Sequence, residues 1–336
     1  MNRTTLSIIA ACAAGAAIAL PSHAAKHSAK ASPNASPYSV EAVNAAEPQG
    51  PVGAKANGAA VLRAQILLDR AHFGSGELDG AYGANLRLAI AGYQKKHDLT
   101  VSGTVDAATW SALNADTSAA LTTYVLQESD LAGPFAPVPT DMGQQAKLAA
   151  LGYASAEEAL AEKFHASPAL LKRLNPGRDF SRAGEEIVVP NVLDIPAVPK
   201  AKKIIVDRSD GTLTLVEAEG LVLAQYPATT GSQRDPLPVG DWKVKGVLKN
   251  PVFHYNPKLF WDAKPDDKAA KIAPGPNNPV GLAWIDLSKP HYGIHGTPSP
   301  STIGKTQSHG CIRLTNWDVM AVAQAVAAGT EVLLQE

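Results

Sequence analysis

The stretch SHGCIRL (residues 308–314) places a histidine, a glycine and a cysteine side by side. Its cysteine, Cys311, is one of only two in the chain, the other being Cys12. A cysteine attacks carbonyl carbons as a thiolate, and because its ordinary pKa is about 8.5 it needs a base or a positive neighbour at neutral pH. Cys311 is therefore a candidate nucleophile, metal ligand, disulfide partner or buried thiol.

The base that Cys311 would need has four candidates in the same third of the chain: His254, His291, His295 and His309. His295 ends the apolar stretch HYGIHG, in which a glycine on either side leaves room for its ring. A histidine at such a strand end can approach a cysteine on a loop. His309 is separated from Cys311 only by Gly310, which favours a tight turn. That turn could aim the amides of His309, Gly310 and Cys311 at one point, as an oxyanion hole requires.

A zinc site is an alternative, since four potential ligands lie in this region: His291, His295, His309 and Cys311. Two of them, His291 and His295, would share a face of a helix, but the intervening Tyr-Gly-Ile favours a strand. The spacing therefore argues against zinc. A buried thiol without chemistry is the second alternative, because free cysteines often behave as small apolar residues.

The wider stretch YGIHGTPSPSTIGKTQSHGCIRLTNWD resembles the catalytic domain of the YkuD family of L,D-transpeptidases. That family has an ordered set of His-Gly, Ile-Gly and Ser-x-Gly-Cys-Ile/Val-Arg. The chain fills it with His295, Gly296, Ile303, Gly304, Ser308, Gly310, Cys311 and Arg313. Residues 274–288 fit the same family, and the likeness covers roughly residues 202–336. The resemblance implies a mainly β, sandwich-like catalytic domain with a short helix.

The family resemblance also implies roles for individual residues. Cys311 would be the nucleophile, His295 the base, and the Gly296 carbonyl the group that orients the imidazole. The amides of His309, Gly310 and Cys311 would stabilise the oxyanion, with Ser308 and Arg313 beside the substrate. If Arg313 lies on a strand, it faces the same side as Cys311 and could bind a substrate carboxylate. Bracing of the catalytic loop is an equally good interpretation of Arg313.

The implied reaction is acyl transfer without a metal or organic cofactor. Cys311 would attack a tetrapeptide stem of peptidoglycan, expel the terminal D-alanine and form a thioester, which an amine on a neighbouring stem would resolve into a 3-3 cross-link. Such an enzyme serves cell-wall organisation and cell shape and is a carbapenem target. Attachment of an outer-membrane lipoprotein, an L,D-carboxypeptidase activity and a non-catalytic wall-binding protein are the alternatives.

The amino terminus predicts export. Arg3 precedes an apolar run that ends at Pro21, and small residues follow, so residues 1–24 are predicted to be a signal peptide cut near Ala24. Lipidation at Cys12 is a rival interpretation. The formal net charge of −1 gives no footprint for nucleic acid, and no later apolar run is long enough to span a bilayer. We expect a periplasmic or cell-wall protein.

Two further modules are predicted between the signal peptide and the catalytic domain, after a flexible linker at residues 25–57. Residues 58–116 resemble a three-helix peptidoglycan-binding type 1 domain on Asp79-Gly80, Tyr93-Gln94 and the segment at residues 103–109. Residues 117–193 resemble a small α+β LysM module in the order strand, helix, helix, strand, with HASPALLKRLNPG carrying the likeness. A Pro-rich insertion at residues 132–141 departs from that pattern, so a spacer domain is the alternative. A linker at residues 194–201 precedes the catalytic domain at residues 202–336.

Overall fold

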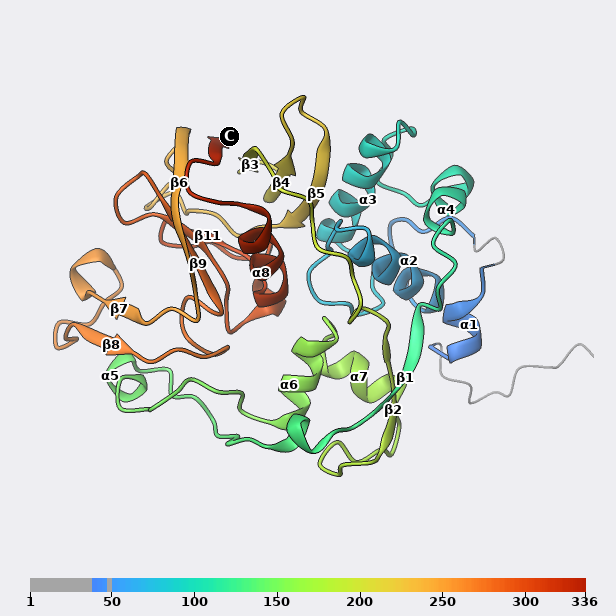
Figure 1. Cartoon of the computed structure of the whole chain (residues 1–336), viewed down its shortest axis with the longest axis horizontal. Coiled ribbons are helices and arrows are strands. Elements are labelled where there is room, and N and C mark those ends of the chain that lie inside the picture. Colours follow the sequence, from blue (N-terminus) through green and yellow to red (C-terminus); the bar gives the residue numbers. More distant parts are fainter. Residues whose placement is uncertain (1–37, 47–49) are drawn as a thin grey trace, which may run out of the picture. The chain divides into compact units, whose positions relative to one another are not determined.

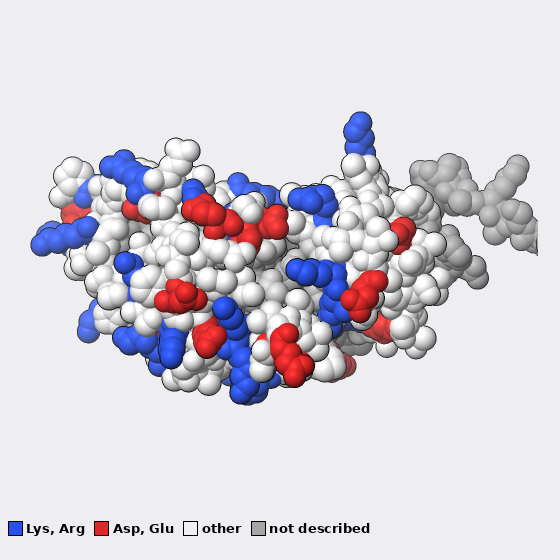
Figure 2. Space-filling model, turned by 90° about the horizontal axis from the view of Figure 1, so that it is seen from above, with Lys and Arg blue, Asp and Glu red and all other residues white. Residues whose placement is uncertain are grey.

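The computed structural model describes residues 38–46 and 50–336 (Figure 1). The predicted signal peptide and Cys12 lie outside the described residues. Among the described residues, no helix is both long and apolar enough to cross a membrane. Basic and acidic side chains are interspersed on the face drawn in Figure 2, in keeping with the near-neutral formal charge.

The amino-terminal region is helical, as predicted. Its helices are α1 (Val40–Asn44), α2 (Ala59–Arg70), α3 (Ala84–Lys96) and α4 (Ala107–Leu113). Asp106 caps α4 by accepting a hydrogen bond from the Thr109 amide, because an aspartate at this position satisfies an otherwise unpaired helical N–H group. The aromatic residues Phe73, Tyr93 and Trp110 pack in the core between α2, α3 and α4.

The prediction of a flexible linker at residues 25–57 is wrong for residues 38–46 and 50–57, the part of this range that the structure describes. Helix α1 buries Val43 completely, and Val52 pairs with Val105 through two backbone hydrogen bonds. The side chain of Asn44 both accepts from the Leu121 amide and donates to the Leu121 carbonyl. This segment has few large apolar residues, but Val43 and Val52 fit cores supplied by later parts of the chain, which the composition of the segment could not reveal.

The middle region follows the predicted order of strand, helix, helix and strand. Its elements are β1 (Leu121–Val125), the short 3-10 helix η1 (Glu128–Leu131), α5 (Met142–Gln145), α6 (Ala156–Lys163), α7 (Pro168–Leu174) and β2 (Glu186–Pro190). Strands β1 and β2 pair antiparallel, and Ser155 and Ser167 cap α6 and α7. Helix α5, which follows the Pro-rich insertion, is an additional element. Residues on both sides of the predicted boundary at residue 116, such as Ile66 and Phe164, share one core.

The carboxyl-terminal region forms an eight-stranded sheet in the order β11-β10-β9-β6-β12-β3-β4-β5. The strands are β3 (Lys203–Asp207), β4 (Thr212–Val216), β5 (Val222–Pro227), β6 (Gly240–Lys249), β9 (Ala283–Leu287), β10 (Gly293–His295), β11 (Ile312–Arg313) and β12 (Glu331–Gln335). The mainly β prediction is confirmed. The expected sandwich-like arrangement is corrected to a single curled sheet, because one strand, β6, belongs to both of its halves.

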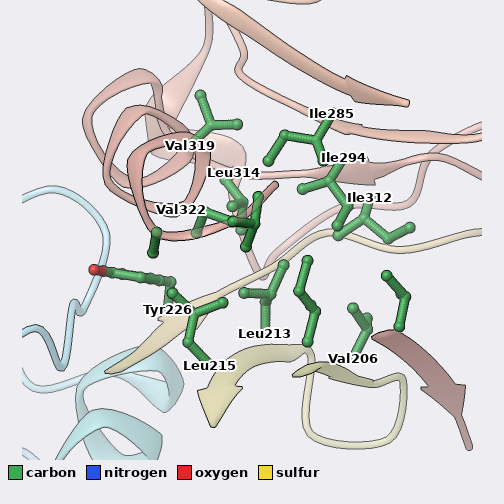
Figure 3. Packing of buried hydrophobic residues seen from close by; sticks show 14 of the residues in the cluster. Val206, Leu213, Leu215, Tyr226, Ile285, Ile294, Ile312, Leu314, Val319 and Val322 are labelled. Atoms are coloured by element: carbon green, nitrogen blue, oxygen red, sulfur yellow. The ribbon is translucent and has the colours of Figure 1, made fainter. Parts of the chain in front are cut away.

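Strand β6 makes the curl by changing partners along its length. Residues 240–243 pair with β12, whereas residues 244–249 pair with β9 across an irregularity near Val244. The two halves therefore face each other across one core, in which Leu213 and Leu215 lie opposite Ile285 and Ile294 (Figure 3). Strand switching of this kind is one way in which β proteins make a corner.

Helix α8 (Asn316–Ala325) packs on this core and begins three residues after the end of β11, the strand that follows Cys311. Thr315 caps it by accepting from the Asp318 amide. The helix ends at Ala325, since the backbone of Val326 is already extended. The Ala325 carbonyl instead accepts from the Ala201 amide, which ties the helix end to the chain before β3.

A small hairpin stands apart from the curled sheet. Its strands β7 (Phe253–Tyr255) and β8 (Ala270–Ile272) pair antiparallel and enclose a long loop with a short 3-10 helix, η2 (Pro257–Leu259). Another such helix, η3 (Pro300–Thr302), lies between β10 and β11. Tyr255 and Ile272 of the hairpin pack against Leu151, and partly buried residues of the Pro-rich segment and α5 surround this cluster.

Replacing Leu151 with alanine tests this packing. Leu151 is fully buried and Leu148, three residues earlier, is 37% exposed. Leu151→Ala should lower the free energy of unfolding by about 2–5 kcal/mol, because the cost of the cavity left behind adds to the lost hydrophobic burial of the side chain. Leu148→Ala should change it by about 0.5 kcal/mol or less. Urea unfolding of both variants measures the difference, and equal effects would contradict the buried position of Leu151.

Candidate active site

A cavity of about 760 Å³ in the carboxyl-terminal region is lined by histidine, cysteine, arginine and aspartate side chains. Its lining includes the predicted residues Cys311, His295, His309 and Arg313. Strands β10 and β11 bring them together because they pair in parallel, with His295 opposite Arg313. Cys311 immediately precedes β11, so the turn that carries it enters the cavity beside the end of β10. Ser308 and Gly310 are buried within that turn.

The His295 ring is fixed by a short hydrogen bond. Its Nδ1 lies 2.7 Å from the Gly296 carbonyl oxygen, and the side chain is only 5% exposed. A carbonyl oxygen can only accept, so Nδ1 must carry the hydrogen and Nε2 holds the lone pair when the ring is neutral. Trp284 stacks on the ring with centroids 5.5 Å apart and an angle of 18°. His295 therefore has both the tautomer and the fixed orientation of a general base.

The electrostatic environment keeps His295 neutral. Burial, and to a smaller extent the charge of Arg313, lower its pKa to about 4, while the hydrogen bond to Gly296 acts in the opposite direction. Burial disfavours the imidazolium because the charged form loses its hydration. At neutral pH the ring is therefore a proton acceptor.

Cys311 is partly exposed, and its thiol is in a mixed environment. Burial raises the pKa of the thiol, whereas a hydrogen bond from the Gly293 backbone and the charge of Arg313 lower it. Its Sγ also lies 3.8 Å from the His291 carbonyl oxygen. A thiol of raised pKa needs a base to remove its proton during attack, which is the role that a neutral His295 can fill.

The turn before Cys311 depends on Gly310 and Ser308. Gly310 has φ +98°, and a Cβ there would lie 2.7 Å from Tyr292 Cε1, so only glycine fits without strain. The Ser308 hydroxyl donates to the Cys311 carbonyl at 2.5 Å and accepts from the Gly310 amide at 3.2 Å. Ser308 therefore holds the turn from inside. The Gly310 amide is engaged there as well, which leaves the amides of His309 and Cys311 as the predicted oxyanion donors.

The side chain of His309 contacts the β7–β8 hairpin loop. Its Nε2 lies 2.9 Å from Asp262 Oδ1, and the rings of Phe260 and Trp261 lie 5.2 and 5.5 Å from its ring. Arg234 in turn lies over Trp261 at 4.5 Å. The hairpin loop is thus attached to His309, in the turn that leads to Cys311, and it forms one wall of the cavity.

Arg313 combines a structural and an electrostatic role. Its backbone exchanges two hydrogen bonds with Thr229, at 2.9 and 3.0 Å, which fixes β11 against the chain after β5. Its side chain lines the cavity, and burial lowers its pKa while Cys311 and Asp262 counteract this. A partly desolvated guanidinium beside the nucleophile can attract a substrate carboxylate.

Sequence reasoning missed several residues of the site, chiefly Trp284, Tyr292, Asp262 and Asn316. A usable signal existed only for Trp284, since alternation along β9 places it on the face of His295, its partner in the strand register. Among residues 38–46 and 50–336, no group of three or more His, Cys, Asp or Glu side chains is arranged to hold a metal ion.

Comparison with known proteins shows the family of this chain. The family model of the YkuD L,D-transpeptidase catalytic domain matches residues 201–334. "Putative L,D-transpeptidase YkuD" of Bacillus licheniformis is 33% identical over 177 residues, which cover 52% of this chain and 90% of that protein. The chain belongs to the YkuD family of L,D-transpeptidases.

Other matches include a second relative, a second domain family and a solved structure. The protein of the same name from Bacillus subtilis is 31% identical over 176 residues, covering 52% of this chain and 90% of the relative. A model described as "Putative peptidoglycan binding domain" matches residues 57–113 of this L,D-transpeptidase-family chain. The crystal structure of L,D-transpeptidase 3 from Mycobacterium tuberculosis in complex with a faropenem-derived adduct aligns at 19% identity and a TM-score of 0.34, covering 46% of this chain and 75% of that one.

Replacing Arg313 with glutamine should make Cys311 less reactive at a given pH. The charge of Arg313 lowers the pKa of both His295 and Cys311, so removing it raises both values. Alkylation by iodoacetamide requires the thiolate, and its pH profile should therefore move to higher pH. Arg234→Gln, an exposed charge beyond Trp261, is the matched control. An unchanged or downward-shifted profile in Arg313→Gln would contradict the electrostatic role.

Proposed function

We propose that this chain is a cysteine-dependent L,D-transpeptidase that makes 3-3 cross-links in peptidoglycan. The observation that carries the proposal is the hydrogen bond from His295 Nδ1 to the Gly296 carbonyl, because it leaves the Nε2 lone pair for the Cys311 thiol in the same cavity. The substrates are a tetrapeptide donor stem and an acceptor stem with a side-chain amine.

The first half-reaction is acylation of Cys311. His295 Nε2 takes the thiol proton as Sγ attacks the carbonyl carbon of the third stem residue, and a C–S bond forms. The oxygen of the tetrahedral intermediate accepts hydrogen bonds from the His309 and Cys311 amides. The C–N bond to the terminal D-alanine then breaks as His295 returns the proton to the leaving amine. Arg313 lies where it can bind the carboxylate of the leaving residue.

The second half-reaction transfers the acyl group to the acceptor. The amine attacks the thioester carbonyl, His295 removes its proton, and the C–S bond breaks to regenerate Cys311. The thioester conserves the free energy of the cleaved peptide bond, so the cross-link needs no nucleotide. All groups that bind, orient or move a proton in this scheme belong to the chain.

The amino-terminal region supports action at the cell wall. Residues 57–113 match a peptidoglycan-binding domain, and binding by this domain would keep the enzyme near its polymeric substrate. We place the mature protein in the periplasm or cell wall, after removal of the predicted signal peptide. An enzyme retained on its substrate in this way needs only a modest affinity for each individual stem, because tethering raises the effective concentration.

Cross-linking can be measured directly on disaccharide-tetrapeptide by mass spectrometry. The wild-type protein should yield a dimer that has lost one D-alanine, and Cys311→Ala and His295→Gln should yield none. His254→Gln, a change of another cavity histidine, is the control and should retain activity. Tripeptide alone would indicate a carboxypeptidase. In a parallel reaction with a lipoprotein added as acceptor, an adduct in place of dimer would indicate attachment to the wall. A Cys311→Ala protein that still forms dimer would refute the assignment.

A carbapenem should acylate the same cysteine. Its strained β-lactam carbonyl needs only the nucleophile, base and oxyanion donors of the first half-reaction, so the intact mass should rise by that of one inhibitor. Peptide mapping should place the adduct on Cys311, and Cys311→Ala should gain no mass. A wild-type protein whose mass stays unchanged after prolonged incubation would argue against a reactive thiol at this position.

A further inference from the structure

The middle region contacts the catalytic region through a partly buried carboxylate. Glu162 on α6 accepts two hydrogen bonds at Oε1, from Asn316 Nδ2 at 3.0 Å and from the Tyr153 hydroxyl at 3.0 Å. Asn316 is the first residue of α8 and is 1% exposed. A carboxylate oxygen that is withdrawn from water needs hydrogen-bond donors, and Oε1 of Glu162 has two of them here.

Asn316 joins this carboxylate to the backbone behind His295. Its Oδ1 accepts from the Leu282 amide at 3.0 Å, and its Nδ2 also donates to the Pro276 carbonyl at 3.1 Å. A Cβ on Gly296 would lie 2.2 Å from Asn316 Oδ1, so the amide oxygen packs directly against the Gly296 backbone. The same holds for Gly281, where the distance would be 2.1 Å.

Gly296 is the residue whose carbonyl fixes the His295 ring. A continuous series of contacts therefore runs from Glu162 through Asn316 and Gly296 to the base. We propose that Glu162 and Asn316 are positioning residues, through which the middle region holds the Gly296 carbonyl in the place that orients His295. The inference rests on the proposed function, since it assigns a purpose to the orientation of that base.

Pro276, Gly281 and Leu282 lie in a loop at residues 274–282, and further contacts hold this loop against the middle region. The Leu151 amide donates to the Pro274 carbonyl at 2.9 Å, and the Asn277 amide donates to the Leu151 carbonyl at 3.0 Å. The Asn277 side chain donates to the Gly152 carbonyl at 3.0 Å and to Glu158 Oε1 at 2.9 Å. Next to Asn316, Trp317 stacks on the His165 ring with centroids 5.0 Å apart. Several hydrogen bonds thus fix residues 274–282 against the middle region, so the position of α6 relative to Asn316 is well defined.

The chemistry of Glu162 makes a discriminating substitution possible. Burial raises the pKa of this carboxyl to about 7, so it is neutral in an appreciable fraction of molecules at neutral pH. Glutamine keeps a carbonyl oxygen at the position of Oε1, with nearly the same shape. Methionine keeps the volume but cannot accept these hydrogen bonds. The pair Glu162→Gln and Glu162→Met therefore separates hydrogen bonding from packing.

The experiment compares the rate of Cys311 acylation by a carbapenem, followed by intact mass, in five full-length proteins. They are the wild type, Glu162→Gln, Glu162→Met, His295→Ala and Glu157→Gln. Glu157 is a control on the same helix, because it pairs with Lys172 rather than with the catalytic region. Glu162→Gln and Glu157→Gln should stay within about twofold of the wild type. Glu162→Met should slow acylation about tenfold, because small displacements of a base reduce rates strongly.

A second readout separates positioning from general destabilisation. For cross-linking by Glu162→Met, we expect kcat to fall about tenfold with KM little changed, since the stem-binding surface is untouched. Equal acylation rates for wild type and Glu162→Met, or equal losses in the Gln and Met variants, would overturn the positioning role. If His295→Ala acylated as fast as the wild type, the assignment of the base itself would fail, and the positioning role would fall with it.

Discussion

The hydrogen bond between His295 Nδ1 and the Gly296 carbonyl is the constraint on which the site depends. A buried, neutral imidazole has two tautomers, and only the one with hydrogen on Nδ1 leaves Nε2 free to accept a proton. The carbonyl makes that choice without adding a charge. A carboxylate in its place would raise the pKa of the ring, whereas here burial and Arg313 hold it near 4. The ring is therefore neutral at neutral pH and able to accept a proton.

The curled sheet brings this hydrogen bond into the reach of Cys311. Because β6 changes partners midway, the half that contains β9, β10 and β11 turns over the half that contains β3, β4 and β5 (Figure 3). Strand β11 has only two residues and lies at the end of the strand order. The turn before it can therefore project into the cavity and is not paired within the sheet. A longer β11 would draw Cys311 into the ladder and away from the His295 ring.

The site and the fold differ in how far the sequence predicts them. The ordered spacing of His295, Gly296, Gly310 and Cys311 is local information, and each lies in the predicted setting of strand end or tight turn. Helix caps such as Asp106 also depend on local sequence, because the side chain bonds an amide three residues later. The curl of the sheet is not local, since β6 alternates like any other strand. The contact between Asn316 and Glu162 joins residues 154 positions apart, so local sequence could not indicate it. The burial of Val43 depends in the same way on distant partners.

The Pro-rich insertion at residues 132–141 shows how a departure from a family pattern can reflect packing within the chain. Val138 and Met142 pack on the cluster of Leu151, Tyr255 and Ile272, so this segment supports the β7–β8 hairpin from behind. Thr140, Asp141 and Met142 also reach the lining of the cavity that contains Cys311. The middle region therefore contacts the catalytic region twice, at the hairpin through its insertion and at the start of α8 through the hydrogen bond between Glu162 and Asn316. These packing contacts account for the insertion whether or not the middle region also binds glycan.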